Sequence, residues 1–300
     1  MTDITLLDGG TGRELARIGA PFRQPEWSAL ALIEAPHYVT RVHQAYVAAG
    51  ADVITTNSYA VVPFHIGAAR FAEQGRELAG LAGRLASEAA RQAPRPVRVA
   101  ASLPPVCGSY RADLFDPAAA RPVLAALIDG LSPHADHWQA ETLSAIEEAQ
   151  LVREILGPQS KPLWLSFTLQ DEDVVAGDPR LRSGQTAEAA VLAAIDLNTQ
   201  AILFNCSQPE VMADAVAVAV ATLQAQGAVM QVGVYANAFP PQSADAEANS
   251  GLDAIRPDLT PQGYLAFAQA WQAAGAGIIG GCCGIGPEHI AALRAALITA

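Results

Sequence analysis

The chain has 300 residues, 51% of them hydrophobic, and a formal net charge of -12 at pH 7. A strongly acidic chain without a lysine or arginine run is a poor candidate for binding nucleic acid or an anionic membrane surface. The sequence shows no secretion signal, no apolar stretch long enough to span a bilayer, and only four cysteines, so we expect a cytoplasmic protein without a disulfide scaffold.

Short apolar runs recur along the chain, and each is followed by a polar or glycine-rich break. Most of them are nearly continuous in hydrophobicity, which is typical of parallel strands covered on both faces. The predicted strands are residues 4–8, 52–57, 97–102, 137–142, 162–168, 201–206, 231–237 and 275–281.

Helical patterns occupy the gaps between these runs. The pattern at 36–50 begins with proline and ends with glycine, the usual punctuation of a helix. The predicted helices are residues 36–50, 69–93, 120–132, 145–157, 186–198, 209–227, 261–275 and 287–299. About eight β/α units predict an α/β fold, a single (β/α)8 TIM barrel that spans residues 1–300 as one domain. An open, doubly wound sheet is the alternative.

In a barrel of this kind the chemistry lies where strands end and βα loops begin. The side chains expected at these strand ends are Asp8, Asn57, Glu141, Thr168, Cys206, Asn237, Cys282 and Cys283. The long irregular segment 239–263 follows the seventh strand, and a loop of this length is usually functional or mobile.

Three of the four cysteines, Cys206, Cys282 and Cys283, are expected to open on the same barrel mouth. Three thiolates with a free fourth position suit a catalytic zinc ion, and the glycines around the adjacent pair permit a sharp turn. The alternatives are buried packing and a strained disulfide between neighbours. Cys107 is interpreted as structural or incidental.

A zinc ion whose charge is already neutralised by three thiolates is a weak Lewis acid toward water. It is better suited to binding a substrate thiolate as a nucleophile for an activated alkyl group. A metal-dependent hydrolase is the alternative, but the six histidines form no H-x-H pattern at a strand end.

The sequence resembles a known family. The motifs LDGGTGREL, ETLSAIEEA, NC at the end of the sixth run and GGCCG near the C-terminus are similar to those of the zinc-dependent homocysteine S-methyltransferases. The resemblance covers essentially the whole chain and implies a (β/α)8 barrel, with Cys206, Cys282 and Cys283 as the Zn²⁺ ligands.

The resemblance also implies the site for the amino-acid part of homocysteine. Asp8 with Gly9 and Gly10 matches the segment that holds this moiety, and Glu141 matches a carboxylate that binds the ammonium group. The alternatives are that Asp8 caps the following helix and that Glu141 pairs with an arginine.

A methyl donor that carries a positive charge is commonly held by aromatic faces. Trp27 and Tyr59 match positions at which the family often has aromatic residues near the donor, although both could serve packing alone. Thr142 stands where betaine-dependent members have tyrosine, which disfavours betaine. We expect methionine biosynthesis from S-methylmethionine, or from S-adenosylmethionine.

The sequence leaves two other functions open. One is the same reaction with another thiol or a selenol as acceptor, and the other is a zinc-binding or redox-sensing barrel without catalytic activity. No G-x-G-x-x-G fingerprint follows a strand, so a Rossmann-type cofactor site is not expected. The partners expected are small-molecule substrates, with no nucleic acid and no membrane, and the sequence does not determine the oligomeric state.

Overall fold

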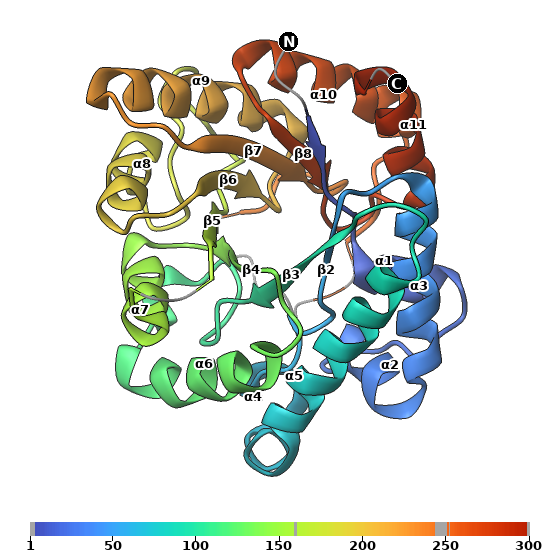
Figure 1. Cartoon of the computed structure of the whole chain (residues 1–300). Coiled ribbons are helices and arrows are strands. Elements are labelled where there is room, and N and C mark those ends of the chain that lie inside the picture. Colours follow the sequence, from blue (N-terminus) through green and yellow to red (C-terminus); the bar gives the residue numbers. More distant parts are fainter. Residues whose placement is uncertain (1–3, 159–160, 244–250, 252, 299–300) are drawn as a thin grey trace.

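The computed structural model is a barrel of parallel strands surrounded by helices (Figure 1). It describes residues 4–158, 161–243, 251 and 253–298. The strands are β1 (Thr5–Leu6), β2 (Val53–Thr55), β3 (Arg98–Leu103), β4 (His137–Leu143), β5 (Leu163–Phe167), β6 (Ala201–Asn205), β7 (Gln231–Ala236) and β8 (Ile278–Gly281). All eight predicted strands are present, and their ends differ from the predicted ones by up to three residues.

The strands are hydrogen-bonded in the order β1-β8-β7-β6-β5-β4-β3-β2. A parallel bridge between Leu7 and Val53 joins the two ends of this series and closes the barrel. This closure confirms the (β/α)8 prediction. It excludes the open doubly wound sheet, which would have two unpaired edge strands.

The helices form the outer layer. They are α1 (Thr11–Arg17), α2 (Ser28–Glu34), α3 (Pro36–Ala49), α4 (Pro63–Ile66), α5 (Ala68–Arg91), α6 (Pro117–Leu131), α7 (Ile146–Leu156), α8 (Ala187–Asp196), α9 (Pro209–Gln226), α10 (Pro261–Ala274) and α11 (Pro287–Leu297), with a 3-10 turn at Ala112–Leu114. Proline starts several of them and left-handed glycines end α3, α9 and α10, as the sequence punctuation predicts. Within the described residues, no helix combines the length and hydropathy that crossing a bilayer requires.

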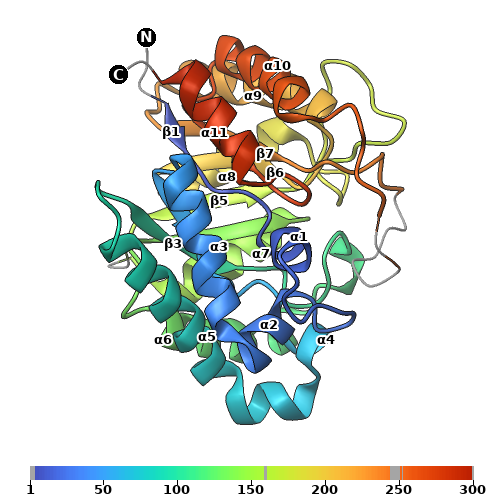
Figure 2. The same ribbon diagram turned by 90° about the vertical axis from the view of Figure 1, so that its right-hand side faces the viewer.

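Two apolar layers stabilise the barrel. The larger layer lies between the strands and the helices, and the smaller one fills the barrel interior around Trp164, Leu203 and Ile278. In the side view of Figure 2, α1 and α4 lie on the same side of the barrel as the segment that precedes α10. The additional helices α1, α2 and α4 belong to the first two βα connections. These two connections therefore contain more helices than a simple β/α unit does.

Candidate active site

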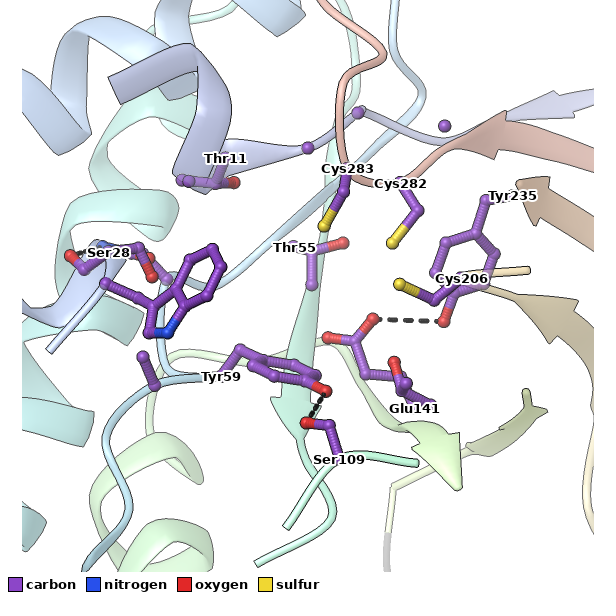
Figure 3. A pocket seen from close by; sticks show the side chains of 18 of the residues that line it. Thr11, Ser28, Thr55, Tyr59, Ser109, Glu141, Cys206, Tyr235, Cys282 and Cys283 are labelled. Atoms are coloured by element: carbon purple, nitrogen blue, oxygen red, sulfur yellow. Dashed lines mark hydrogen bonds between the residues drawn. The ribbon is translucent and has the colours of Figure 1, made fainter. Parts of the chain in front are cut away.

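Three cysteine sulfurs meet at the carboxyl ends of the strands (Figure 3). Cys206 follows β6, and the adjacent Cys282 and Cys283 follow β8. Their Sγ atoms all lie within 4.8 Å of one another. Since Zn–S bonds are about 2.3 Å long, tetrahedral coordination needs sulfurs about 3.8 Å apart, so the three side chains fit a zinc ion with small adjustments.

Unusual backbone conformations place these sulfurs. Cys206 has φ 54°, in the left-handed region that side chains other than glycine rarely adopt. At Gly281, a Cβ atom would lie 2.2 Å from the side chain of Ile285, so only glycine allows the turn to fold back directly after β8. Strain and close packing at these positions are typical of functional sites.

The thiols in this cluster are electrostatically unequal. Hydrogen bonds from Cys206 and Cys282 lower the pKa of the Cys283 thiol. Hydrogen bonds to Cys206 and Cys283, together with burial, raise the pKa of Cys282. Buried together, the three thiols oppose one another's ionisation, and a divalent cation is the group that would stabilise three thiolates together.

Glu141 lies beside the cluster on β4. A register shift between Ala140 and Leu143 interrupts the pairing of β4 with β5, and this bulge coincides with the position of Glu141. The Glu141 carboxylate accepts hydrogen bonds from the Ser102 hydroxyl and, at 3.1 Å, from the Tyr235 hydroxyl. Burial raises its pKa to about 7. Its hydrogen-bond partners are hydroxyl groups, so the alternative of an arginine partner is wrong.

Asp8 lies two residues after β1, next to the bridging Leu7, and is 4% exposed. Its carboxylate accepts hydrogen bonds from Thr55, at 2.7 Å from the amide and 3.0 Å from the hydroxyl. It makes no cap of α1, whose N-cap is Gly10 with no side-chain hydrogen bond, so the capping alternative is also wrong. Burial raises the pKa of Asp8 to about 7.

Gly9 and Gly10 connect β1 to α1 along the pocket wall. The Gly10 amide donates a hydrogen bond to Ile285 O at 3.0 Å, and a Cβ on Gly10 would lie 2.5 Å from Cys282 O. The glycine turn therefore packs against the turn that carries the cysteine pair. This contact gives the two glycines a definite structural role at the site, in addition to the substrate-binding role predicted for them.

Aromatic side chains also line the same pocket. Trp27 and Tyr59 are both half-buried and line it together with the buried His65. The Tyr59 hydroxyl lies 2.6 Å from the Ser109 hydroxyl (Figure 3), and the Trp27 ring stands edge-on to Phe22. The structure thus brings the predicted aromatic residues into the cavity that contains the cysteines and carboxylates.

Sequence reasoning missed two tyrosines at this site. Tyr235 on β7 donates to Glu141, and Tyr110 in the loop after β3 lies 3.0 Å from Cys206 Sγ. The rule that barrel chemistry occupies strand ends could have found Tyr235. Tyr110 lies seven residues beyond the end of β3, where sequence position gives no orientation.

The long segment predicted at 239–263 contributes to the mouth, although residues 244–250 and 252 lie outside the described part. Gln242 and Asp253 line the pocket. Arg13 Nη2 donates to Asp253 O at 2.5 Å, and Gln24 donates to Gly251 O at 2.8 Å. Cys107, by contrast, is half-buried outside the cluster, with its sulfur 3.9 Å from Asp116 O.

Comparison with known proteins identifies the family to which this chain belongs. The sequence model of a family described as homocysteine S-methyltransferase matches residues 5–297. The chain belongs to this family. It is therefore a methyltransferase, as its relatives are.

Named relatives extend the comparison over nearly the whole enzyme. A homocysteine S-methyltransferase of Escherichia coli K12 is 32% identical, over 98% of this chain and 95% of its own length. A selenocysteine Se-methyltransferase of Brassica oleracea var. italica is 27% identical, over 98% and 89%. The metallated form of the E. coli homocysteine methyltransferase MmuM superposes with a TM-score of 0.73, at 30% identity over 98% of this enzyme and 96% of that chain.

Proposed function

We propose that this enzyme transfers a methyl group from a sulfonium donor to the sulfur of homocysteine and forms methionine. The observation that carries the proposal is the cluster of Cys206, Cys282 and Cys283, which opens into the same cavity as two buried carboxylates. The family membership and the homocysteine S-methyltransferase of E. coli support homocysteine as the acceptor. In this proposal the barrel works as one homocysteine-binding domain.

The three cysteines are the proposed ligands of a zinc ion. The donor set favours zinc because thiolates are soft ligands and three of them leave one position open. When bound, such an ion supplies a site that keeps the acceptor sulfur as a thiolate at neutral pH. The metallated form known for MmuM supports a metal in this family.

The carboxylates orient the acceptor. Glu141 and Asp8 are buried, and burial raises the pKa of each to about 7. An ammonium group placed between them would supply the positive charge that offsets this burial and would favour the ionised form of both. We therefore assign the homocysteine ammonium to this pair, which leaves its side chain directed toward the cysteine cluster.

The aromatic wall receives the donor. Trp27 and Tyr59 offer ring faces that can hold a sulfonium, and they line the same pocket as the cysteines, so donor and acceptor can be held in line for transfer. The acceptor sulfur forms a bond to the methyl carbon while the bond from that carbon to the sulfonium breaks, and the donor leaves as a neutral sulfide. S-methylmethionine is the first candidate, because ETLSAIEEA and the threonine at position 142 resemble that branch of the family, and S-adenosylmethionine is the second.

A selenol acceptor is the second candidate function. The relative from Brassica oleracea is named a selenocysteine Se-methyltransferase and covers this chain as fully as the homocysteine enzyme does. The same cluster could hold a selenolate without any change in mechanism, so the acceptor must be decided by competition between the two substrates.

The test is methionine formation by the zinc-loaded enzyme with homocysteine and, in parallel, S-methylmethionine, S-adenosylmethionine or betaine. We expect methionine with S-methylmethionine and loss of that activity after chelation. Stoichiometric zinc without methionine from any donor would overturn the assigned reaction. Absence of zinc, with Cys282 and Cys283 oxidised together, would favour the redox-sensing alternative instead.

A further inference from the structure

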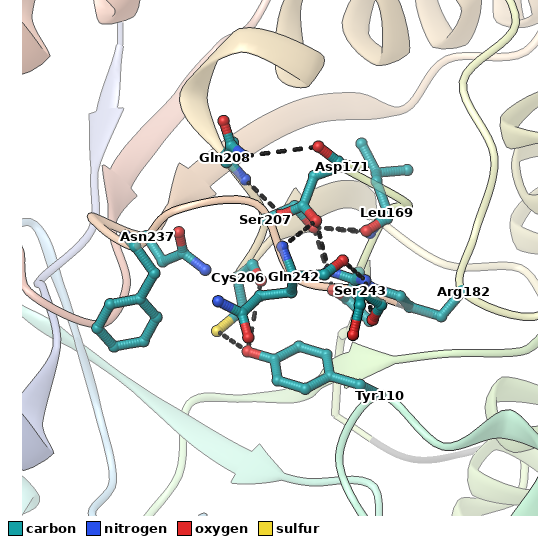
Figure 4. Close-up of polar contacts among 12 residues, drawn as sticks. Tyr110, Leu169, Asp171, Arg182, Cys206, Ser207, Gln208, Asn237, Gln242 and Ser243 are labelled. Atoms are coloured by element: carbon teal, nitrogen blue, oxygen red, sulfur yellow. Dashed lines mark hydrogen bonds and ion pairs between the residues drawn. The ribbon is translucent and has the colours of Figure 1, made fainter. Parts of the chain in front are cut away.

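Tyr110 contacts the cysteine cluster but has no role in the reaction proposed above. Its hydroxyl lies 3.0 Å from Cys206 Sγ and 3.5 Å from Cys206 O (Figure 4). Tyr110 has φ 67°, a left-handed conformation that is costly for a bulky side chain. A strained residue whose polar atom reaches a proposed ligand sulfur is a candidate for a functional constraint.

The direction of this hydrogen bond follows from the state of the sulfur. A cysteine that binds a metal is a thiolate and has no proton to donate, so the Tyr110 hydroxyl must be the donor. A hydrogen bond to an ionised acceptor is stronger than one between neutral groups. It also withdraws electron density from the sulfur, so Cys206 becomes a weaker donor to the metal than it would be without this bond.

A buried ion pair holds the Tyr110 ring in place. The guanidinium carbon of Arg182 lies 5.1 Å from the centroid of this ring. Arg182 Nη2 binds Asp171 Oδ1 at 2.9 Å, and the two side chains are only 3% and 0% exposed. A cation over the ring face fixes its orientation and draws charge from the phenol, which makes the hydroxyl a better donor.

The same pair connects the cluster to the segment after β7. The Asp171 carboxylate accepts from the amides of Gln208, at 3.1 Å, and Gln242, at 2.9 Å. Arg182 Nη1 donates to Gln242 O at 2.8 Å. Gln208 follows Cys206 by two residues and Gln242 lines the pocket, so one ion pair fixes the backbone on both sides of the Tyr110–Cys206 contact.

We propose that Tyr110 is a positioning residue of the metal centre, which donates a hydrogen bond to the Cys206 thiolate and is held there by the Asp171–Arg182 pair. The inference rests on the proposed zinc–thiolate function. By weakening one of three strong donors, Tyr110 leaves the bound metal a better acceptor for a fourth thiolate, that of the substrate.

The test compares the unmodified enzyme and Tyr110→Phe after loading with cobalt(II), which reports on sulfur ligands through its thiolate charge-transfer absorption. Loss of the hydrogen bond should shift this band to longer wavelength, because the Cys206 sulfur becomes more electron-rich. Zinc affinity, measured by competition with a chromophoric chelator, should fall about tenfold, the usual cost of an outer-shell partner, because the lost positioning of the Cys206 sulfur outweighs its stronger donation. An unchanged band together with unchanged zinc affinity would overturn the proposal.

Two further variants separate this effect from a loss of folding. Tyr46→Phe removes another buried hydroxyl, which donates to Ile285 O at 3.1 Å and touches no sulfur. It should lower the melting temperature without moving the cobalt band. Arg182→Lys keeps the charge beside Asp171 but loses the planar fork, and it should give a smaller band shift than Tyr110→Phe; no shift would remove Arg182 from the proposal.

Cys206→Ser distinguishes failure of this inference from failure of the proposed function. Stoichiometric metal and full activity in that variant would overturn the zinc–thiolate function, and the role of Tyr110 with it. If Cys206→Ser is inactive while Tyr110→Phe matches the unmodified enzyme in band position and zinc affinity, only the role of Tyr110 is overturned.

Discussion

The two halves of the pocket are built differently. In the sulfur and carboxylate half, Asp8, Glu141, Cys206 and the pair at 282–283 lie on barrel strands or just after them. In the aromatic half, Trp27 lies between α1 and α2, and Tyr59 lies between β2 and α4. Hydrogen bonding between strands fixes the first set, whereas the second depends on loop packing such as the contact of Trp27 with Phe22.

On the proposed function, this difference assigns the chemistry to the first half and the choice of donor to the second. Strand ends hold groups in one geometry, as metal binding and bond formation require. Loop residues can be replaced without rebuilding the barrel. We therefore expect substitutions in the first half to abolish the reaction, and substitutions in the second half to change donor affinity.

The largest effect is expected from the cysteines. Cys206→Ser, Cys282→Ser or Cys283→Ser should each release the metal and lower activity by more than about 100-fold. Loss of an outer-shell partner alone costs up to about that much. Metal content and kcat/KM check this, while circular dichroism should show an intact barrel. Cys107→Ser is the matched control and should leave both quantities unchanged. Full activity in any of the three variants would remove that cysteine from the ligand set.

Glu141→Gln tests the carboxylate side of the same half. The variant keeps the size of the side chain and removes the charge, so KM for homocysteine should rise about 30-fold or more, since unpairing a buried charge costs about 2–5 kcal/mol. Bound zinc should stay stoichiometric. An unchanged KM would contradict the ammonium assignment.

Trp27→Leu probes the aromatic half. Loss of the ring face should raise KM for the sulfonium donor about tenfold, in line with a cation–π interaction of about 1–2 kcal/mol, and leave KM for homocysteine unchanged. Trp27→Phe retains a ring and should recover most of the affinity. An equal rise in KM for donor and acceptor would contradict the separate roles assigned to the two halves of the pocket.

The smallest expected effect is the pH dependence of acceptor binding. Burial raises the pKa of Glu141 and of Asp8 to about 7, so both carboxylates become charged only near and above neutral pH. KM for homocysteine should therefore rise several-fold as pH falls from about 8 to about 6, with a smaller rise in Glu141→Gln.

The same pKa values set the sign for stability. The folded protein without substrate holds these protons more tightly than the unfolded chain, so the contribution of the two carboxylates to the free energy of unfolding should decrease as pH rises from about 4 to about 7. Burial lowers the pKa of His43 to about 4 and of His137 to about 3, and these groups contribute with the opposite sign, so the carboxylate effect is read as a difference between two proteins. In denaturant titrations, the unmodified enzyme should lose stability relative to Glu141→Gln as pH rises through this window, and a constant difference would show that Glu141 does not titrate there.

Much of the fold and of the strand-end half could be predicted because both depend on local pattern. Hydrophobic runs and proline and glycine punctuation gave eight strands close to their observed bounds, and the barrel rule then placed Cys206 near Cys282. The partners of these groups could not be predicted. Tyr110 and Cys206 are 96 residues apart, and neither periodicity nor a motif encodes a contact between a loop and a strand end.

The alternatives for Asp8 and Glu141 failed for a related reason. Helix capping and an arginine partner are common local explanations for a carboxylate. The structure instead uses Thr55 for Asp8, and Ser102 and Tyr235 for Glu141, which lie on neighbouring or facing strands of the closed barrel. Such partners are evident only when the order and register of the strands are known.

The packing of Gly10 against the backbone of Cys282 has a consequence for biosynthesis. The Gly10 amide bonds to Ile285 O, and β1 pairs with β8, so the segment that leaves the ribosome early is completed by one that leaves it much later. Until Ile285 is free, the nascent chain has no closed barrel and only one of its three clustered sulfurs in a folded setting. If the cysteines bind zinc as proposed, barrel closure and metal loading should therefore occur together, as one late event in the maturation of the enzyme.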